Sequence, residues 1–176
     1  TDLPNQRLFA MQLEQAIKRA ARAGARLALL FINIDRFKDI NDSLGRPAGD
    51  VLLQQFVGRL VASQGEEVPV ARHGCDGFLA LVEHLNDAQP AAVAAQKLLD
   101  ALAQPFRIMG HDVFNGVSIG ISLYPADGEG AEALLRNAEV AMYRAKELGR
   151  GRYQFYTNDL TERARERLSL AAQLRR

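Results

Sequence analysis

The segment 72–78, with the sequence RHGCDGF, places one carboxylate where a tight turn between two strands is expected. Apolar runs at 68–71 and 78–82 flank it, a pattern typical of a β-hairpin. Sites that join nucleotides through Mg²⁺ usually use two carboxylates, because this ion prefers hard oxygen ligands and neutralises developing negative charge. The turn supplies Asp76, but Gly77 occupies the next position, where a second acid could stand.

The remaining chain alternates helical and strand patterns around this turn. Residues 27–34 form a continuous apolar run between breakers, which predicts a strand buried on both faces. The polar segment 35–49 predicts no regular element. Gly149 is predicted to be the C-cap of a helix at 131–148. Helices are predicted at 5–23, 51–62, 91–103, 131–148 and 160–176, and further strands at 106–114, 117–123 and 153–156.

Hairpins mixed with crossover helices favour an α+β fold in which helices cover a largely antiparallel sheet. The 176 residues suit one domain with a substantial core. The chain opens on Thr1 rather than Met, so we expect a fragment of a longer protein.

Composition argues against several classes of partner. The formal net charge is +1, so no global field attracts the chain to nucleic acid or to a membrane surface. The single Cys75 excludes an internal disulfide. No apolar run is long enough to span a bilayer. We therefore predict a cytoplasmic domain with no nucleic-acid partner and no direct membrane contact.

Several segments match one family at its own spacings, and together they identify a resemblance to the GGDEF domain, the catalytic domain of bacterial diguanylate cyclases. Residues 33–42 resemble D-I-D-x-F-K-x-I-N-D, and residues 72–78 resemble R-x-G-G-D-E-F. Further matches are TDLPN at 1–5, the glycines and acid at 45–50, VSIGI at 117–121, and AMYRAK at 141–146 followed by Gly149 and Arg150.

This resemblance implies a five-stranded, mainly antiparallel sheet wrapped by helices, similar to the palm of nucleotidyl cyclases. The family joins two GTP molecules into cyclic di-GMP, with two domains facing each other, which implies a homodimer. The GGDEF-like domain would cover 1–157. Residues 158–176 resemble a linker helix leading to a phosphodiesterase domain of the EAL type.

By resemblance, Asn41 and Asp50 are the guanine-binding residues. A carboxylate can accept both N–H donors on one edge of guanine, and a side-chain amide can add a further contact. Turn and cap preferences offer an alternative, in which Asn41 makes a turn contact and Asp50 caps a helix that begins at Val51.

The resemblance also implies the phosphate-binding residues. The turn Arg36, Phe37 and Lys38 would offer backbone amides, while Lys146 and Arg150, four apart on one helical face, would offer cations. The alternative is an ordinary basic helix end that faces water and balances the helix dipole.

Three departures from the family pattern fall at the metal site. The family holds Mg²⁺ with the first acid after strand one, the following backbone and the first acid of the turn, which here are Asn33, the backbone of Ile34, and Asp76. An amide oxygen can coordinate Mg²⁺ but carries no charge, so Asn33 is a weak ligand. The acid that assists catalysis is replaced by Gly77, between Asp76 and Phe78.

Cys75 replaces the second glycine of the turn, after Gly74. A side chain there should crowd the ribose or the phosphates. If this position needs a positive φ, Cys75 costs roughly 1–2 kcal/mol, unless Gly77 takes over the positive φ. The alternative for Cys75 is an inert small side chain, since reactive thiols need an electropositive setting.

These departures predict a catalytically impaired domain of cyclic di-GMP signalling that binds GTP with Mg²⁺ and regulates an attached EAL-type phosphodiesterase. Two alternatives stay open at this point. One is a weakly active diguanylate cyclase, because Asp76 and the cations remain. The other is an interaction or dimerisation module that binds no nucleotide.

Overall fold

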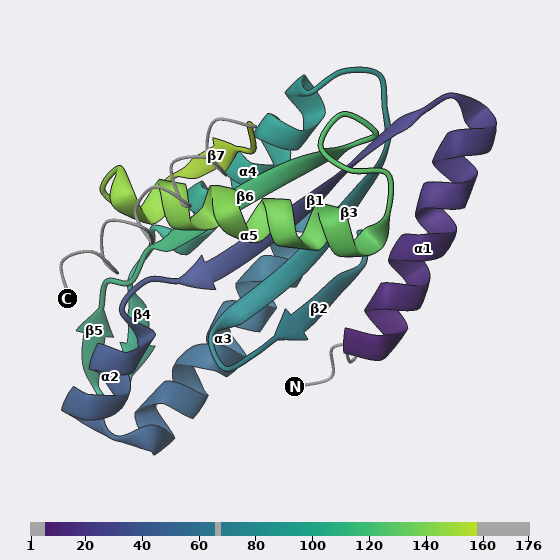
Figure 1. Ribbon diagram of the computed structural model, residues 1–176. Coiled ribbons are helices and arrows are strands. Elements are labelled where there is room, and N and C mark those ends of the chain that lie inside the picture. The colour runs from purple at the N-terminus through teal and green to yellow at the C-terminus, as the bar shows by residue number, and fades with distance from the viewer. Residues whose placement is uncertain (1–5, 66–67, 158–176) are drawn as a thin grey trace, which may run out of the picture.

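The computed structural model describes residues 6–65 and 68–157. The TDLPN motif at 1–5 and the predicted linker helix at 158–176 therefore lie outside the described residues. Within the described part, a five-stranded sheet forms the centre of the molecule and helices cover both of its faces (Figure 1).

The sheet has the order β2-β3-β1-β6-β7. All pairs are antiparallel except β6 and β7, which run parallel. This confirms the predicted α+β fold with a mainly antiparallel sheet. The strands are β1 (Arg26–Ile34), β2 (Val70–His73), β3 (Gly77–Leu85), β6 (Val117–Tyr124) and β7 (Tyr153–Phe155).

The central strand β1 is buried on both faces, as its apolar run predicts. Side chains alternate across a strand, so Leu29 and Phe31 lie in one core while Leu30 and Ile32 lie in the other. The first core packs against α1 (Gln6–Ala23) and α5 (Ala131–Glu147), and the second against α3 (Arg46–Gln64) and α4 (Gln89–Leu102).

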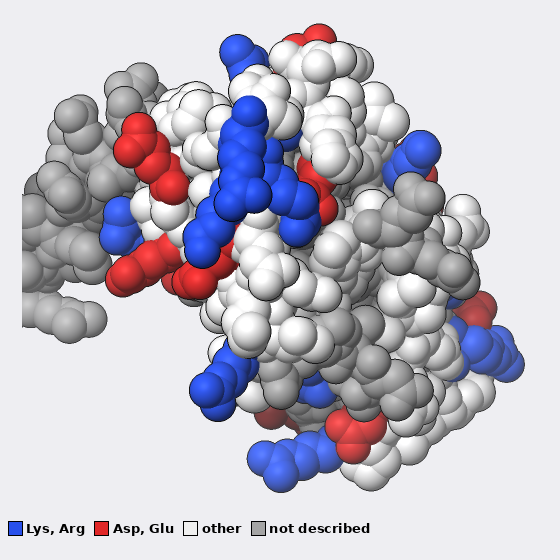
Figure 2. All heavy atoms as spheres, turned by 90° about the vertical axis from the view of Figure 1, so that its right-hand side faces the viewer, with Lys and Arg blue, Asp and Glu red and all other residues white. Residues whose placement is uncertain are grey.

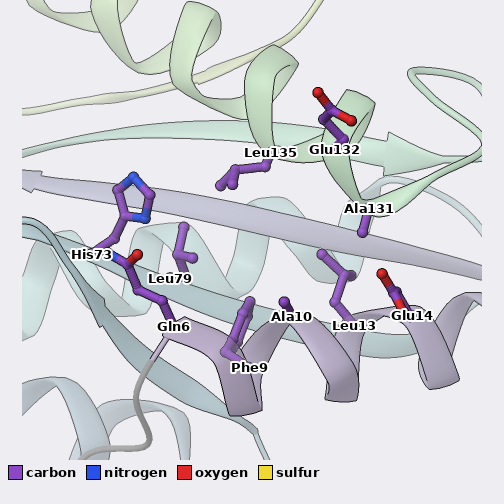
Figure 3. Close-up of a pocket in the computed structure, with 10 residues that line it drawn as sticks. All are labelled: Gln6, Phe9, Ala10, Leu13, Glu14, His73, Leu79, Ala131, Glu132 and Leu135. Carbon is purple, nitrogen blue, oxygen red and sulfur yellow. The ribbon is translucent and has the colours of Figure 1, made fainter.

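Between α1 and α5 lies a cavity of about 310 Å³ (Figure 3). Phe9 and Leu13 line it from α1, and Leu135 lines it from α5. His73, at the end of β2, also lines it and makes an edge contact with Phe31, with ring centroids 5.1 Å apart. The imidazole of His73 therefore faces the α1/α5 side of the sheet.

The segment 35–49 is more regular than predicted, because it contains α2 (Phe37–Leu44) and the first turn of α3. Phe37 is only 7% exposed and anchors α2 in the core, a burial that contributes about 1.5–3 kcal/mol. Gly45, with φ of 89°, separates the two helices. The polar residues of α2, which obscure its helical pattern in the sequence, lie on its outer face.

The predicted single strand at 106–114 is wrong. The chain forms a separate two-stranded hairpin of β4 (Phe106–Ile108) and β5 (His111–Val113). Met109 and Gly110 both have positive φ, 52° and 83°, and reverse the chain between the strands.

The face that carries α1 shows basic side chains close to acidic ones (Figure 2). Arg19 of α1, for example, pairs with Glu83 of β3 at 3.0 Å. Such a mixed surface matches the small net charge, and the predicted absence of a nucleic-acid partner stays a prediction. Among the described helices, none combines the length and the apolar character that crossing a membrane requires.

Candidate functional site

Several of the predicted site residues lie at or beside the carboxyl end of β1. In Figure 1, this end of β1 points toward the side of the molecule where α2 begins and where α5 ends. We call this region the β1-end site and define it by Asn33, Asp35, Asp76, Lys146 and Arg150.

Four residues form a row across the sheet at this end. His73 lies opposite Gly77, Gly77 lies opposite Asn33, and Asn33 lies opposite Ser118. Residues directly opposite one another in a sheet project to the same face, about 4.8 Å apart in the hydrogen-bonding direction. Gly77 is the one member of this row that contributes no side chain.

The turn between β2 and β3 is fastened to its surroundings by main-chain contacts. The carbonyl oxygen of Asp76 accepts a hydrogen bond from the N–H of Ile34 at 3.0 Å, which places Asp76 beside the end of β1. Arg72 donates to the carbonyl oxygens of Gly74 at 3.1 Å and of Cys75 at 2.9 Å. Motif spacing gives Arg72 no role, although it opens the turn motif in the sequence.

The conformation of the turn corrects one expectation. Gly74 has φ of 73°, whereas neither Cys75 nor Gly77 has a positive φ. Cys75 therefore carries no left-handed strain, and Gly77 takes over no such conformation. The Cys75 side chain is exposed.

Gly77 instead meets a packing constraint. A Cβ atom at this position would lie 2.5 Å from the carbonyl oxygen of His73. Real Cβ atoms essentially never approach a backbone oxygen so closely. In this hairpin, the position that holds an acid in the family motif has no room for a side chain unless the backbone shifts.

Asn33 is 7% exposed, and its side-chain oxygen has no hydrogen-bond partner within the part of the chain that the structure describes. A buried oxygen left in this state costs about 1–3 kcal/mol, so a cation or a donor would be favourable there. Asp76 is part-exposed at the turn, and its main chain is bonded to Ile34, the residue after Asn33. Residues 6–65 and 68–157 hold no group of three or more His, Cys, Asp or Glu that could bind a metal by themselves. Oxygen donors of this kind suit Mg²⁺, although most of the ion's ligands would have to come from elsewhere.

The corner between α2 and α3 brings Asn41 next to Gly49 and Asp50. A Cβ atom at Gly49 would collide with the side-chain oxygen of Asn41, so glycine at this position leaves room for the amide. Gly45 donates its N–H to the carbonyl oxygen of Asn41 at 2.9 Å and fixes the corner. Asp50 lies inside α3, whose N-cap is Gly45, so the alternative in which Asp50 caps a helix starting at Val51 is wrong.

Arg36 forms the N-cap of α2 in a left-handed conformation, with φ of 57°. Phe37 and Lys38 are therefore the first two helical residues, and the N–H groups at this end of a helix have no acceptor inside the helix. The arrangement offers backbone donors immediately after β1, as the motif predicts. The side chains of Arg36 and Lys38 are exposed.

Lys146 and Arg150 do not share a helical face, which corrects the prediction. Helix α5 ends at Glu147, with Leu148 rather than Gly149 as its C-cap. Gly149 has φ of 123° and turns the chain out of the helix, and Arg150 follows with φ of 64°. Lys146 is part-buried on the helix, whereas Arg150 is exposed in the loop before β7.

Sequence reasoning gave no role to Asp35. It is 5% exposed, and its carboxylate accepts hydrogen bonds from the Ser118 hydroxyl at 2.7 Å and from the N–H of Gly151 at 3.2 Å. The available signal was its spacing, because residues 33 and 35 project to the same face of a strand. Asp35 thereby connects the end of β1 with β6 and with the loop that carries Arg150.

Asp127 lies in the loop after β6, away from the row of residues at the β1 end. Burial raises the pKa of the Asp127 carboxyl above its ordinary value of 3.8, and a hydrogen bond from the N–H of Leu123 offsets part of that rise. This perturbed carboxyl marks a structural position in the loop between β6 and α5.

Comparisons with known proteins agree with this geometry. A family model described as diguanylate cyclase, GGDEF domain, matches residues 1–152. The bifunctional diguanylate cyclase/cyclic di-GMP phosphodiesterase MucR of Pseudomonas aeruginosa is 42% identical over 175 residues, which are 99% of this chain and 25% of that protein.

Two solved structures are similar in fold and in sequence. The GGDEF domain of TpbB from Pseudomonas aeruginosa has a TM-score of 0.86 at 37% identity and covers 89% of this chain and 98% of that one. An EAL/GGDEF domain protein from M. capsulatus has a TM-score of 0.74 at 45% identity, with coverage of 88% and 99%. The chain spans only about a quarter of the length of MucR.

Proposed function

This chain belongs to the GGDEF domain family of diguanylate cyclases, and we propose that it binds GTP while its own synthesis of cyclic di-GMP is impaired. Family membership places it in cyclic di-GMP signalling. In this proposal the GTP-binding domain is residues 1–157. GTP is the ligand, and Mg²⁺ enters with it.

The observation that carries the impairment is the row across the sheet. Of the three acids that the family motif uses for metal binding and catalysis, two are replaced here by Asn33 and Gly77, which lie opposite each other, and Asp76 remains. Losing one of two metal carboxylates removes several kcal/mol of transition-state stabilisation, on the order of a 10³-fold loss in rate. The absence of room for a Cβ atom between Gly77 and the His73 carbonyl oxygen also supports a turn that is packed without an acid at this position.

The observation that supports binding is the α2–α3 corner. Asn41 has its space preserved by Gly49, and Asp50 is an exposed carboxylate on the following turn, available to a guanine edge. The first N–H groups of α2, together with Lys146 and Arg150, would face the triphosphate. Asp76, Asn33 and the backbone of Ile34 would hold one Mg²⁺, which neutralises phosphate charge.

Calorimetric titration of GTP in the presence of Mg²⁺ tests binding directly, with Asp50→Ala as the variant that removes the guanine carboxylate. We expect saturable binding by the wild type and a loss of at least tenfold in the variant, since a charged hydrogen-bond pair contributes about 1.5–3 kcal/mol. Absence of heat with the wild-type protein would refute GTP binding and leave an interaction module.

A weak cyclase is the second candidate function, because Asp76 is still held beside β1 by the hydrogen bond from Ile34. Incubation with GTP and Mg²⁺, followed by chromatography, separates the two candidates. We expect no accumulation of cyclic di-GMP above a control with Asp76→Ala. Rapid product formation would refute the impairment.

The wider role is regulatory in this proposal. The relatives MucR and NbdA are named as a bifunctional cyclase/phosphodiesterase and as a cyclic di-GMP phosphodiesterase. We propose that the full protein carries an EAL-type phosphodiesterase after this domain and that GTP bound here changes its activity. Hydrolysis of cyclic di-GMP by the full-length protein, measured with and without GTP and with Asp50→Ala, tests this coupling.

A further inference from the structure

Asp35 is a buried acidic side chain to which the proposed GTP chemistry gives no role. It lies one residue beyond β1, and its N–H donates to the carbonyl oxygen of Gly116 at 2.9 Å. Its two carboxylate oxygens accept separate hydrogen bonds, one from Ser118 and one from the N–H of Gly151. None of the ion pairs among the described residues includes Asp35. Burying a carboxylate without a cation costs free energy, which the hydrogen bonds to this side chain must offset.

The carboxylate holds an unusual loop. Gly149, Arg150 and Gly151 have φ of 123°, 64° and 60°, three successive residues in the left-handed half of backbone space. Arg150 is not a glycine, so its conformation costs roughly 1–2 kcal/mol and needs support from its surroundings. The N–H of Arg150 donates to the carbonyl oxygen of Ala145, and that of Gly151 donates to Asp35.

Gly116 packs beside this contact at ordinary van der Waals distances. A Cβ atom at Gly116 would lie 3.5 Å from the carboxylate and 3.7 Å from the Cα atom of Gly151. Three segments far apart in sequence therefore meet at Asp35: the end of β1, the start of β6 and the loop between α5 and β7. The last of these carries Arg150, and the N–H of Gly149 connects it to Lys146 at 3.2 Å.

We propose that Asp35 is the positioning residue of the phosphate site: by holding Gly151, it sets the direction in which Arg150 meets the phosphates of the nucleotide. This inference rests on the proposed GTP binding and adds a residue to it. Asp35 acts through the loop and touches neither the nucleotide nor the metal. Its contribution should therefore scale with the number of phosphates on the ligand.

A role as a metal ligand is the competing explanation, and one substitution separates the two. In Asp35→Asn, the amide oxygen can still accept from Gly151. The amide nitrogen can donate to Ser118, because a hydroxyl both donates and accepts. Asp35→Asn thus keeps both contacts and removes the charge, whereas Asp35→Ala removes the contacts as well.

The experiment compares the dissociation constants of GTP and GMP, with Mg²⁺ present, for wild type, Asp35→Asn, Asp35→Ala and Arg150→Ala. Asp127→Ala is the matched control, because it also deletes a carboxylate that accepts a hydrogen bond from a backbone N–H. Asp127 is part-buried and lies in the loop that follows β6, at the other end of that strand. Thermal unfolding of every variant accompanies the titrations.

We expect Asp35→Ala to weaken GTP binding about tenfold more than GMP binding, since the loop loses one or two hydrogen bonds and Arg150 loses its direction. Asp35→Asn should stay within about threefold of the wild type for both ligands, and Asp127→Ala should leave their ratio unchanged. Adding Asp35→Ala to Arg150→Ala should cost little more than Arg150→Ala alone, because both act through one loop.

Equal losses of GTP and GMP affinity in Asp35→Ala would overturn the inference, as would a large loss in Asp35→Asn, which would indicate a need for the charge. If Asp35→Ala does not fold, Ser118→Ala replaces it and should lower the ratio of GTP affinity to GMP affinity about threefold. An unchanged ratio of the two affinities would overturn the inference. A wild-type protein that binds no GTP overturns the proposed function and this inference together. Binding by the wild type with no change of ratio in the variants overturns the inference alone.

Discussion

Gly77 offers a quantitative test of how the signature turn is packed. The Gly77→Ala substitution adds one Cβ atom 2.5 Å from the carbonyl oxygen of His73. The gap has to widen by about 0.9 Å to reach the 3.4 Å at which ordinary van der Waals contact begins. Because the obstructing atom belongs to the backbone, the hairpin itself must shift, and such overpacking typically costs about 1–3 kcal/mol.

For a chain of this size, each kcal/mol lowers the melting temperature by about 2–4 °C, so we expect Gly77→Ala to melt about 2–12 °C below the wild type. Gly58→Ala is the matched control. Gly58 lies inside α3 with no atom within 4 Å of its added Cβ atom, and replacing a mid-helix glycine with alanine adds about 0.5–1 kcal/mol. The two variants should therefore shift stability in opposite directions.

Urea and thermal unfolding followed by far-ultraviolet circular dichroism measure both shifts. A Gly77→Ala variant as stable as the wild type would refute the packing argument. The same contact predicts that Gly77→Glu, which restores the acid of the family motif, gains no cyclase activity by itself. A large gain in cyclic di-GMP synthesis by Gly77→Glu would show that the hairpin backbone shifts at little cost in free energy, contrary to the packing argument.

Three further predictions concern other positions. Gly49→Ala should displace the Asn41 amide and weaken GTP binding about tenfold. The loss in the free energy of unfolding, measured with guanidinium, should be smaller than the loss in the free energy of GTP binding. Asn33→Asp should return a carboxylate to the row and tighten Mg²⁺ binding in the presence of GTP, measured by calorimetry; a value unchanged from wild type would count against Asn33 as a ligand position. For Asp127, the raised pKa means that the folded state holds the proton more tightly than the unfolded state, so its stabilising effect is present below pH 3.8 and is lost as the pH rises through the folded-state pKa. Asp127→Asn should therefore gain stability relative to wild type as the pH is raised from acid to neutral, and a pH-independent difference would contradict this reasoning.

The sequence predicts the centre of this fold well, because local patterns decide it. The apolar run of β1 leaves little alternative to a strand buried on both faces, and the glycine-containing link at 72–78 predicts the hairpin. Local pattern fails where one buried side chain outweighs many polar ones, as Phe37 does in α2. It also fails where a turn is hidden in an apolar stretch, as Met109 and Gly110 are.

The site is predicted in part for the same reason. Motif spacing proposes Asn41, Asp50 and Asp76 as site residues, which stays a prediction, but it does not reveal that Asp35 accepts a hydrogen bond from a residue 116 positions away. Such a contact exists only after β6 and the loop before β7 have come together on the sheet. The conformation of Arg150 is also invisible to helical spacing, because Gly149 ends the periodicity one residue earlier.

The shortness of β7 has a mechanical consequence. Only six positions separate Arg150 from Tyr156, and the strand between them is a three-residue edge of the sheet. The N–H of Ile119 donates to the carbonyl oxygen of Arg152 at 3.0 Å, and the N–H of Tyr156 donates to that of Ile121 at 2.8 Å, so both ends of this edge strand are bonded to β6. Because β7 has no neighbour among the described strands on its other side and follows the loop directly, a displacement of this edge strand would pass along the chain to Arg150.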